Sequence, residues 1–249
     1  MYNKTIGLIG YGHLGHAIHE RAEEVGIDLQ VTEGKGHNAE LASASDIVIL
    51  TVKPDQIAEV LDEIKGAISD RTSILSFAAA GSIDKMRKQL GRTKRSQDHR
   101  ITRAMTDINL RQVLATWGMD TVDLCQSLSR NDLVSAYNEA DIARFTVYVG
   151  CLPGVAAWQF ANNQNADAWL RGYLEHIEYS IGVPVGVTSE IVREIQAKGD
   201  YEKTVQQVAT KGGVTESLIQ ALEAGHSGYT YLHDVGYERI EEIESRLKK

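Results

Sequence analysis

The sequence contains little of what marks several classes of protein. Among its 249 residues there are only two cysteines, Cys125 and Cys151, and neither belongs to a Cys-x-x-Cys pair. Two cysteines in a chain of this length cannot build a disulfide framework. Cys125 lies in a periodic apolar stretch, so we expect it to be buried as a small hydrophobic residue.

Long apolar runs and an excess of positive charge are also missing. No stretch approaches the roughly 18 apolar residues that a membrane span needs. The formal net charge is −8, which argues against a nucleic-acid partner because a polyanion needs clustered positive charge. The one basic cluster, residues 91–100, is interpreted as a solvated loop. The chain begins with a strand pattern and no signal-peptide architecture, so we expect a cytoplasmic protein.

The dominant pattern is an alternation of strands and helices. Six short apolar segments are predicted as strands: residues 5–9, 27–32, 46–52, 73–77, 101–105 and 113–117. Helical patterns follow the first and the third of these segments, and Ser82 is expected to cap a further helix that ends near Gly91. Such alternation predicts a parallel sheet with right-handed crossovers. From residue 139 onward the pattern is mainly helical. We therefore predict an α/β protein with a Rossmann-type domain at residues 1–138 and an all-helical domain at residues 139–249.

A glycine-rich turn follows the first predicted strand. Gly10, Gly12 and Gly15 form the pattern Gly-x-Gly-x-x-Gly, and a helix begins inside it. In a dinucleotide-binding turn the first glycine permits the tight turn. The second allows the backbone to approach the pyrophosphate, and the third allows the helix to pack close to the strand. The start of the helix then offers unpaired N–H groups to the phosphates. The alternative is a glycine-lined turn that binds no ligand.

An acidic residue lies where the second strand should end. Glu33 follows Gly15 by 18 residues, close to the usual spacing of about 20 for the acid that binds the adenosine ribose. An acid there favours NADH, because it would repel the 2′-phosphate of NADPH. Lys35 and His37 follow closely and could favour NADPH, so both cofactors stay open. Glu33 could also be a solvated loop residue.

Three histidines in the first predicted helix suggest a metal site at first sight. His13, His16 and His19 recur every three residues. At about 100° per residue, however, His19 lies roughly 60° away from the line of the other two. No cysteine or carboxylate at ligand spacing completes a site. We predict no metal, and assign these residues to the helix surface or the cofactor edge.

Five segments together resemble the pyrroline-5-carboxylate reductase family: GYGHLGHAI, LTVKP, SFAAAG, ITRAM and ATKGGVTESLIQALEAG. They follow the family's order over most of the chain, and LTVKP and GGVT are the most specific. The resemblance implies an enzyme of proline biosynthesis, an imine reductase that converts 1-pyrroline-5-carboxylate to proline with NADPH or NADH. It also implies a helical C-terminal domain that forms a homodimer, often assembled further into rings.

The resemblance assigns individual residues to the cofactor. It places Gly10, Gly12, His13, Leu14 and Gly15 at the pyrophosphate, Asn38 at the adenosine ribose, Val52, Lys53 and Pro54 beside the nicotinamide half, and Ala78 and Ala79 beneath the nicotinamide ring. For Lys53 the alternative is a surface lysine after a strand.

A second set of residues is assigned to the substrate: Thr210, Gly212, Gly213, Val214 and Thr215. Thr215 is the candidate catalytic residue, matching the threonine whose hydroxyl bonds the substrate nitrogen, and a hydroxyl can donate or accept there. Glycines before a helix start are expected to expose N–H groups that suit a carboxylate. The alternative for Thr215 is a plain helix N-cap.

The chain departs from the family at several points. The stretch before Asn38 is very short. The family pattern Met-Pro-Asn-Thr-Pro is replaced by residues 105–109, and Gly-Ser-Gly-Pro-Ala-Tyr by residues 150–155. Glu216 stands where an apolar residue is usual; pointing inward, it would repel a carboxylate and imply a neutral or cationic substrate. Two hypotheses follow: a reductase of pyrroline-5-carboxylate or another cyclic imine, or a catalytically silent dinucleotide-binding relative.

Overall fold

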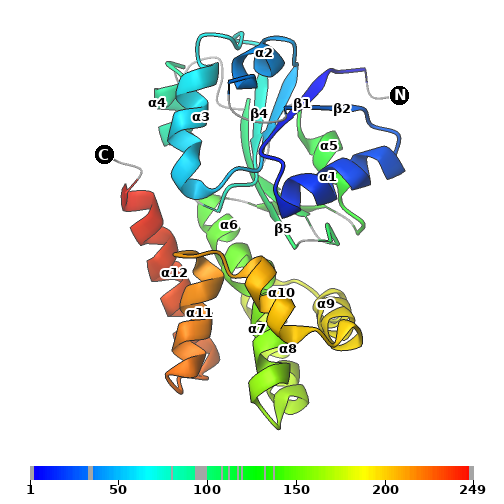
Figure 1. Cartoon of the computed structure of the whole chain (residues 1–249), viewed down its shortest axis with the longest axis vertical. Helices are drawn as coiled ribbons and strands as arrows, with labels where there is room; N and C mark the ends of the chain where they lie inside the picture. The colour runs from blue at the N-terminus through cyan, green and yellow to red at the C-terminus, as the bar shows by residue number, and fades with distance from the viewer. Residues whose placement is uncertain are drawn as a thin grey trace. The chain divides into compact units, whose positions relative to one another are not determined.

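The chain forms two compact units, Met1–Ile142 with Ile243–Lys249, and Ala143–Glu242. The computed structural model (Figure 1) describes residues 3–32, 36–79, 81–92, 100–107, 109–111, 113–116, 118, 120–131, 133–136 and 138–246. The first unit contains a sheet and the second is built from helices, which confirms the predicted fold class.

The sheet of the first unit has seven strands in the order β2-β1-β3-β4-β5-β6-β7. Their bounds are β1 (Ile6–Ile9), β2 (Leu29–Val31), β3 (Ile47–Leu50), β4 (Ser73–Ser76), β5 (Ile101–Thr106), β6 (Val113–Thr116) and β7 (Val134–Ala136). Each predicted strand is present, and most are shorter than predicted. All neighbouring pairs are parallel except β5 and β6.

The antiparallel pair corrects the expectation of a wholly parallel sheet. Only six residues connect β5 to β6, whereas a parallel crossover needs about a dozen or more. Strand β7 was not predicted at all. It has three residues, of which Ala136 is buried and Ser135 is exposed, so it carries almost no apolar pattern.

Helices cover both faces of the sheet. They are α1 (His13–Glu24), α2 (Asn38–Ser43), the 3₁₀ turn η1 (Pro54–Gln56), α3 (Ile57–Ile64), α4 (Ile83–Gln89) and α5 (Val122–Leu128). The core on one face joins Leu8 and Ile49 to Ile18 of α1 and Leu124 of α5. The core on the other face joins Ile9 and Leu50 to residues of α2, α3 and α4. Burial on both faces explains the continuous apolar runs in these strands.

In the part that the structure describes, the second unit consists of helices, the first and last of which begin or end in the first unit. Helix α6 (Glu139–Phe145) leads into a π-helical turn at Thr146–Gly150, and the remaining helices are α7 (Leu152–Asn162), α8 (Ala166–Ile181), α9 (Val185–Lys198), α10 (Tyr201–Val208), α11 (Val214–Glu223) and α12 (Tyr229–Arg246). Helix α7 is central and contacts α8, α9, α10 and α11. No helix in the described ranges is long and apolar enough to cross a membrane.

Two prolines of the helical region lie at helix starts. Pro153 lies in the first turn of α7, where a missing N–H costs nothing, and Pro184 precedes α9. In the first unit, the Ser82 hydroxyl accepts the Lys85 N–H at 3.4 Å, so the predicted N-cap of α4 is confirmed.

Candidate functional site

The glycine turn connects β1 to α1 at the carboxyl edge of the sheet. Gly10 has φ +101°, and a Cβ there would lie 2.7 Å from the backbone nitrogen of Val52. Both the backbone angle and the close approach of the segment after β3 therefore require glycine at this position. The hydroxyl of Thr51 also bonds the Gly10 carbonyl, so the end of β3 holds the turn in place.

The other two glycines of the turn have opposite surroundings. A Cβ on Gly15 would lie less than 3.0 Å from the carbonyl oxygen of Gly10, whereas a Cβ on Gly12 would meet no protein atom within 4 Å. Gly12 is the N-cap residue of α1, and no side chain in the described ranges caps this helix. The first-turn N–H groups of His13, Leu14 and Gly15 thus lie beside open space, an arrangement that suits an anion.

The segment after β3 lies next to this turn. Val52 contacts Gly10, as the spacing above shows, and Pro54 begins η1. Lys53 is exposed, and its backbone N–H donates to the Gln56 side chain at 3.3 Å. Thr51 was not predicted as a site residue, although it lies inside the LTVKP segment and carries the only hydroxyl there.

The segment after β4 is held by an arginine that the sequence analysis missed. Arg103 of β5 is 2% exposed, and its guanidinium donates to the carbonyls of Ala78 and Ala79 at 3.4 and 3.1 Å. It also pairs with Glu139 at 3.3 Å and with Glu244 at 3.7 Å. An arginine inside a predicted strand was the available signal, because arginine is rarely buried unless it is paired.

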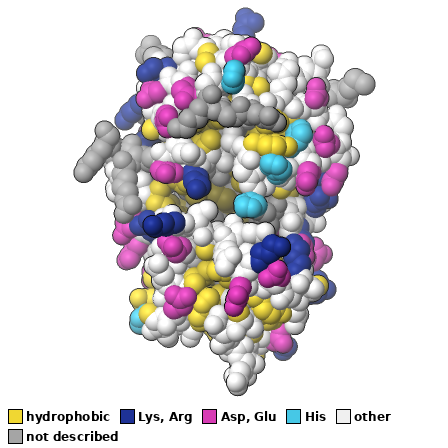
Figure 2. Space-filling view, in the orientation of Figure 1, with side chains coloured by type: hydrophobic (Ala, Val, Ile, Leu, Met, Phe, Trp, Pro, Cys, Tyr) yellow, Lys and Arg dark blue, Asp and Glu magenta, His cyan; other side chains and the backbone are white. Residues whose placement is uncertain are grey.

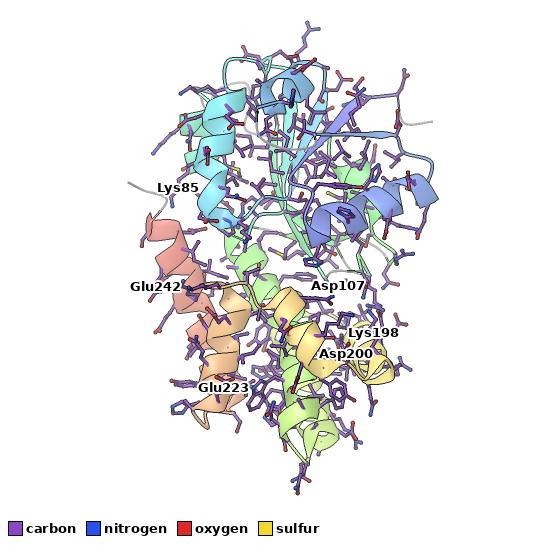
Figure 3. The ribbon with its side chains drawn as sticks, viewed as in Figure 1. Lys85, Asp107, Lys198, Asp200, Glu223 and Glu242 are labelled. Carbon is purple, nitrogen blue, oxygen red and sulfur yellow. The ribbon has the colours of Figure 1, made fainter. Side chains whose placement is uncertain are left out.

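Two neighbours extend the contacts of Arg103. Glu139 also accepts the backbone N–H of Ile83 at 2.9 Å. Lys85, labelled in Figure 3, donates to the backbone carbonyl of Glu244. The segment that carries Ala78 and Ala79 is therefore tied to the start of α6 and the end of α12, all within the first unit.

Of the two residues assigned to the adenosine ribose, only Asn38 lies within the described part of the chain. Asn38 begins α2 and is buried, and its amide nitrogen donates to Glu63 at 2.6 Å while its oxygen accepts the Thr32 hydroxyl at 3.2 Å. Both ends of the side chain thus bind within the protein. Glu33 lies outside the described residues.

The histidines of α1 pack with the tyrosine of the glycine turn. The ring centroids of Tyr11 and His16 lie 3.8 Å apart, and the Tyr11 hydroxyl is 2.9 Å from Nδ1 of His19. Figure 2 shows histidine side chains over the region of α1, where His13 and His16 are exposed. Tyr11, His16 and His19 thus form a surface cluster of rings beside the turn.

Backbone groups of Gly212 and Gly213 form hydrogen bonds with other residues of the second unit. The Glu216 carboxylate accepts the Gly212 N–H at 2.6 Å, and the Gly213 N–H donates to the Thr210 carbonyl at 2.8 Å. Arg239 donates to the Gly212 carbonyl through Nε at 3.0 Å and Nη2 at 2.5 Å. The expectation that these glycines expose N–H groups is wrong, because both groups are satisfied internally.

Thr215 lies in the first turn of α11 and is 9% exposed. The helix begins at Val214 with Gly213 as its N-cap, so the alternative that Thr215 is the N-cap is wrong. Its methyl group packs on Gly154 of α7. Burial raises the pKa of Cys151 to about 12, and the nearby Thr215 hydroxyl opposes this only in part, so the thiol is neutral.

The described residues of the two altered segments make specific contacts. Asp107 is fully buried, accepts the N–H groups of Asn109 and Arg111 at 3.1 and 2.8 Å, and pairs with the Arg111 side chain. Cys151 and Gly154, from the second segment, are the residues that contact Thr215. Both segments are therefore integral parts of the fold.

The fold and the glycine turn define a Rossmann-type domain whose turn has the dinucleotide-binding pattern, and comparisons with known proteins agree with this fold. A family model described as NADP oxidoreductase, coenzyme F420-dependent, matches residues 20–80. Pyrroline-5-carboxylate reductase of Methanosarcina acetivorans is 32% identical over 99 residues, covering 32% of this chain and 37% of that protein. Pyrroline-5-carboxylate reductase of Aquifex aeolicus is 30% identical over 122 residues, covering 42% and 43%.

Two solved structures share this fold over nearly the whole chain. Plasmodium falciparum pyrroline carboxylate reductase with NADP bound has a TM-score of 0.56 at 17% identity, covering 98% of both chains. D-mandelate dehydrogenase with NADH and anilino(oxo)acetate has a TM-score of 0.54 at 13% identity, covering 98% and 99%. These identities show the fold alone. The sequence matches span less than half of the length of the curated pyrroline-5-carboxylate reductases to which this chain is similar. The two solved structures hold different nicotinamide cofactors, NADP in the first and NADH in the second.

Proposed function

We propose that this protein uses NADH or NADPH to reduce the C=N bond of a small cyclic imine of the pyrroline class. Pyrroline-5-carboxylate, reduced to proline, is the first compound to test, because both curated relatives carry the name of that reaction. The alternatives are an imine reductase with another substrate and a catalytically silent dinucleotide-binding relative.

The observation that carries the cofactor proposal is the environment of Gly12. Open space at this residue, beside the uncapped start of α1, is what a pyrophosphate needs. We assign Gly10, Gly12, His13, Leu14 and Gly15 to the pyrophosphate, and residues 52–54 with Ala78 and Ala79 to the nicotinamide half. When bound, the reduced nicotinamide supplies the hydride for the imine carbon.

The observation that carries the substrate proposal is the packing of Thr215, which is 9% exposed and has its methyl group against Gly154. A hydroxyl can accept a hydrogen bond from a protonated imine nitrogen and donate one to the amine product. We propose that Thr215 orients the substrate nitrogen in this way, with Thr210, Gly212, Gly213 and Val214 shaping the loop around it.

We further propose that residues 1–138 bind the dinucleotide and that residues 139–249 hold the substrate and form a homodimer in the cytoplasm. The dimer is suggested by the family resemblance, since closed symmetric assemblies are the usual state of such enzymes. Light scattering at micromolar concentration tests it, and a stable monomer would contradict it.

The experiment for the reaction compares wild type, Thr215→Val and Thr215→Ser. Binding of NADH and NADPH is measured by fluorescence titration, and cofactor oxidation is followed with pyrroline-5-carboxylate and with 1-pyrroline. Loss of one positioned hydrogen-bonding group typically costs about 10² to 10³ in rate. Thr215→Val should lose about that factor with cofactor affinity unchanged, and Thr215→Ser should retain much of the activity. Tight cofactor binding without turnover of any imine would favour the silent relative.

A further inference from the structure

The end of strand β2 is linked to a carboxylate on α3 through Asn38. Thr32 directly follows β2, and its backbone N–H extends the pairing with β1 by donating to the Leu8 carbonyl at 3.5 Å. The Thr32 hydroxyl donates to the side-chain oxygen of Asn38 at 3.2 Å, and the Asn38 amide nitrogen donates to the Glu63 carboxylate at 2.6 Å. Two consecutive hydrogen bonds therefore hold the Glu63 carboxylate near the carboxyl end of β2.

The end of the second strand is also where a Rossmann domain binds the adenosine ribose, usually through an acid that accepts the 2′-hydroxyl of NADH. Asn38 is 8% exposed and both ends of its side chain bind within the protein. Glu63 is exposed, and within the described ranges its carboxylate has no hydrogen bond or ion pair besides the bond from Asn38. A carboxylate can accept several hydrogen bonds, so Glu63 retains the capacity to bind a ligand hydroxyl.

We infer that Glu63 selects NADH over NADPH, because its carboxylate accepts the 2′-hydroxyl of the adenosine ribose and repels a 2′-phosphate at the same place. This inference rests on the proposed use of a nicotinamide cofactor and specifies which of the two is used. The acid comes from α3 instead of from the end of β2 itself. Asn38 is then a positioning residue, whose amide group holds the carboxylate beside that strand end.

The charges around Glu63 act in the same direction. Helices α2 and α3 pack on the same face of the sheet (Figure 1). Together they contain no lysine or arginine and four acidic residues: Glu40, Glu59, Asp62 and Glu63. Lys65, just beyond α3, pairs with Asp62 at 2.9 Å, and in formal charge Lys35 is offset by Glu33. A 2′-phosphate would therefore meet an excess of negative charge here, whereas a 2′-hydroxyl would not be repelled.

The experiment measures dissociation constants for NADH and NADPH in wild type, Glu63→Gln and Glu40→Gln. Glu63→Gln keeps a carbonyl oxygen that can accept the Asn38 amide N–H and removes the charge. Glu40→Gln is the matched control, because Glu40 is an exposed acid of α2 that faces His37 at 3.7 Å and does not bind Asn38. Fluorescence titration at about pH 8, where an ordinary histidine is neutral, keeps histidine charge out of the comparison.

Wild type should bind NADH about tenfold or more tightly than NADPH, from a like-charge contact near the protein surface. Glu63→Gln should tighten NADPH binding by about tenfold. It should weaken NADH binding by about fivefold, because a hydroxyl bonds a charged acceptor more strongly than a neutral one. Glu40→Gln should stay within about twofold of wild type for both cofactors. A wild-type preference for NADPH, or equal changes of both constants in Glu63→Gln, would overturn the inference.

These titrations separate the inference from the proposed reaction, because they need no imine. Wild-type constants in Glu63→Gln would also overturn the inference and would leave the cofactor preference to Glu33, whatever the enzyme reduces. The expected binding pattern without turnover of any imine would reject the proposed reaction and keep the role of Glu63. Failure of wild type to bind either cofactor would reject both.

Discussion

Gly15 of helix α1 lies directly against the carbonyl oxygen of Gly10, so close that a Cβ at residue 15 would come within 3.0 Å of it. This contact fixes the angle at which the start of α1 faces the space over Gly12. Gly15 therefore determines how the turn packs, whereas Gly12 determines whether a ligand has room beside the turn.

That separation predicts opposite effects of two substitutions. Gly12→Val should leave the fold intact, since its φ of −86° suits any residue and its Cβ meets nothing, but it should abolish binding of NADH and NADPH. Gly15→Ala should destabilise the fold by about 1–3 kcal/mol through overpacking. Urea unfolding and cofactor titration on both variants check this. Normal titration curves in folded Gly12→Val would refute the site.

Gly154 and Thr215 should be energetically coupled. A Cβ at Gly154 would overlap the Thr215 methyl group and lie 3.0 Å from Val208, so Gly154→Ala should cost about 1–3 kcal/mol of unfolding free energy. Thr215→Ser removes that methyl group, and the double variant should recover part of the loss. A double-mutant cycle by urea unfolding measures the coupling, and additive effects would show that these two residues do not share the space.

Arg103 should matter for both stability and cofactor use. Arg103→Met leaves the carbonyls of Ala78 and Ala79 and the carboxylate of Glu139 without their partner, so it should lower the free energy of unfolding by about 2–4 kcal/mol. The KM for the cofactor should also rise. Arg71→Met, at an exposed arginine, is the control and should change stability by about 0.5 kcal/mol or less. Equal stabilities of the two variants would contradict the role of Arg103.

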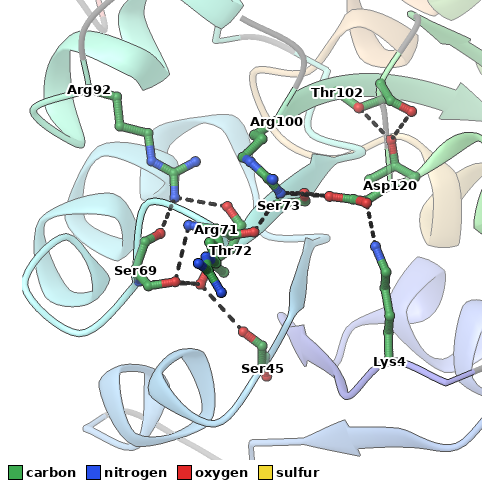
Figure 4. Close-up of polar contacts among 12 residues, drawn as sticks. Lys4, Ser45, Ser69, Arg71, Thr72, Ser73, Arg92, Arg100, Thr102 and Asp120 are labelled. Carbon is green, nitrogen blue, oxygen red and sulfur yellow. Dashed lines mark hydrogen bonds and ion pairs between the residues drawn. The ribbon is translucent and has the colours of Figure 1, made fainter. Parts of the chain in front are cut away.

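Asp120 should make stability depend on acid pH. It binds Lys4, the Ser73 hydroxyl at 2.9 Å and Arg100 at 2.6 Å (Figure 4), and chiefly the hydrogen bond from Lys4 lowers its pKa below the ordinary 3.8. A carboxyl with a depressed folded pKa contributes its full stabilisation above the unfolded value. That stabilisation is lost as the pH falls through the folded pKa.

Asp120→Asn should accordingly be less stable at neutral pH, by about 1 kcal/mol for such a partly exposed group. It should also lose less stability than wild type on going from neutral pH to below 3.8. Urea unfolding across this range is the measurement. Asp123→Asn, at an exposed position on α5, is the control and should follow the wild-type curve. Parallel curves for wild type and Asp120→Asn would disprove the prediction.

The cofactor preference should depend on Glu33. NADH should bind at least as well as NADPH, and Glu33→Ser should improve NADPH binding by removing a charge that repels the 2′-phosphate. Glu40→Ser, at an exposed acid of α2, is the nearby control. Dissociation constants for both cofactors decide the question. A strong native preference for NADPH would mean that Glu33 points away from the ribose.

Much of the first unit could be predicted from the residues in order along the chain. Strand β3 is a continuous apolar run, and β1 is apolar apart from Gly7, because both faces of the sheet are covered. The spacing of Gly10, Gly12 and Gly15 follows from what a tight turn and a close helix require. Ser82 caps α4 through a contact three residues away. These features are local, so a short window of sequence contains their cause.

Only the tertiary structure decided which distant groups meet. Arg103 reaches carbonyls in the segment after β4 and carboxylates on α6 and α12, and nothing in the spacing of these residues encodes that convergence. Strand β7 pairs with β6 although its own pattern is almost featureless. Glu216 and Arg239 close the loop at Gly212 from different helices. The sequence placed a glutamate beside Thr215, but whether its charge faces a ligand or the backbone depends on how α11 and α12 pack, because hydrogen-bond partners are set by distance in space rather than along the chain.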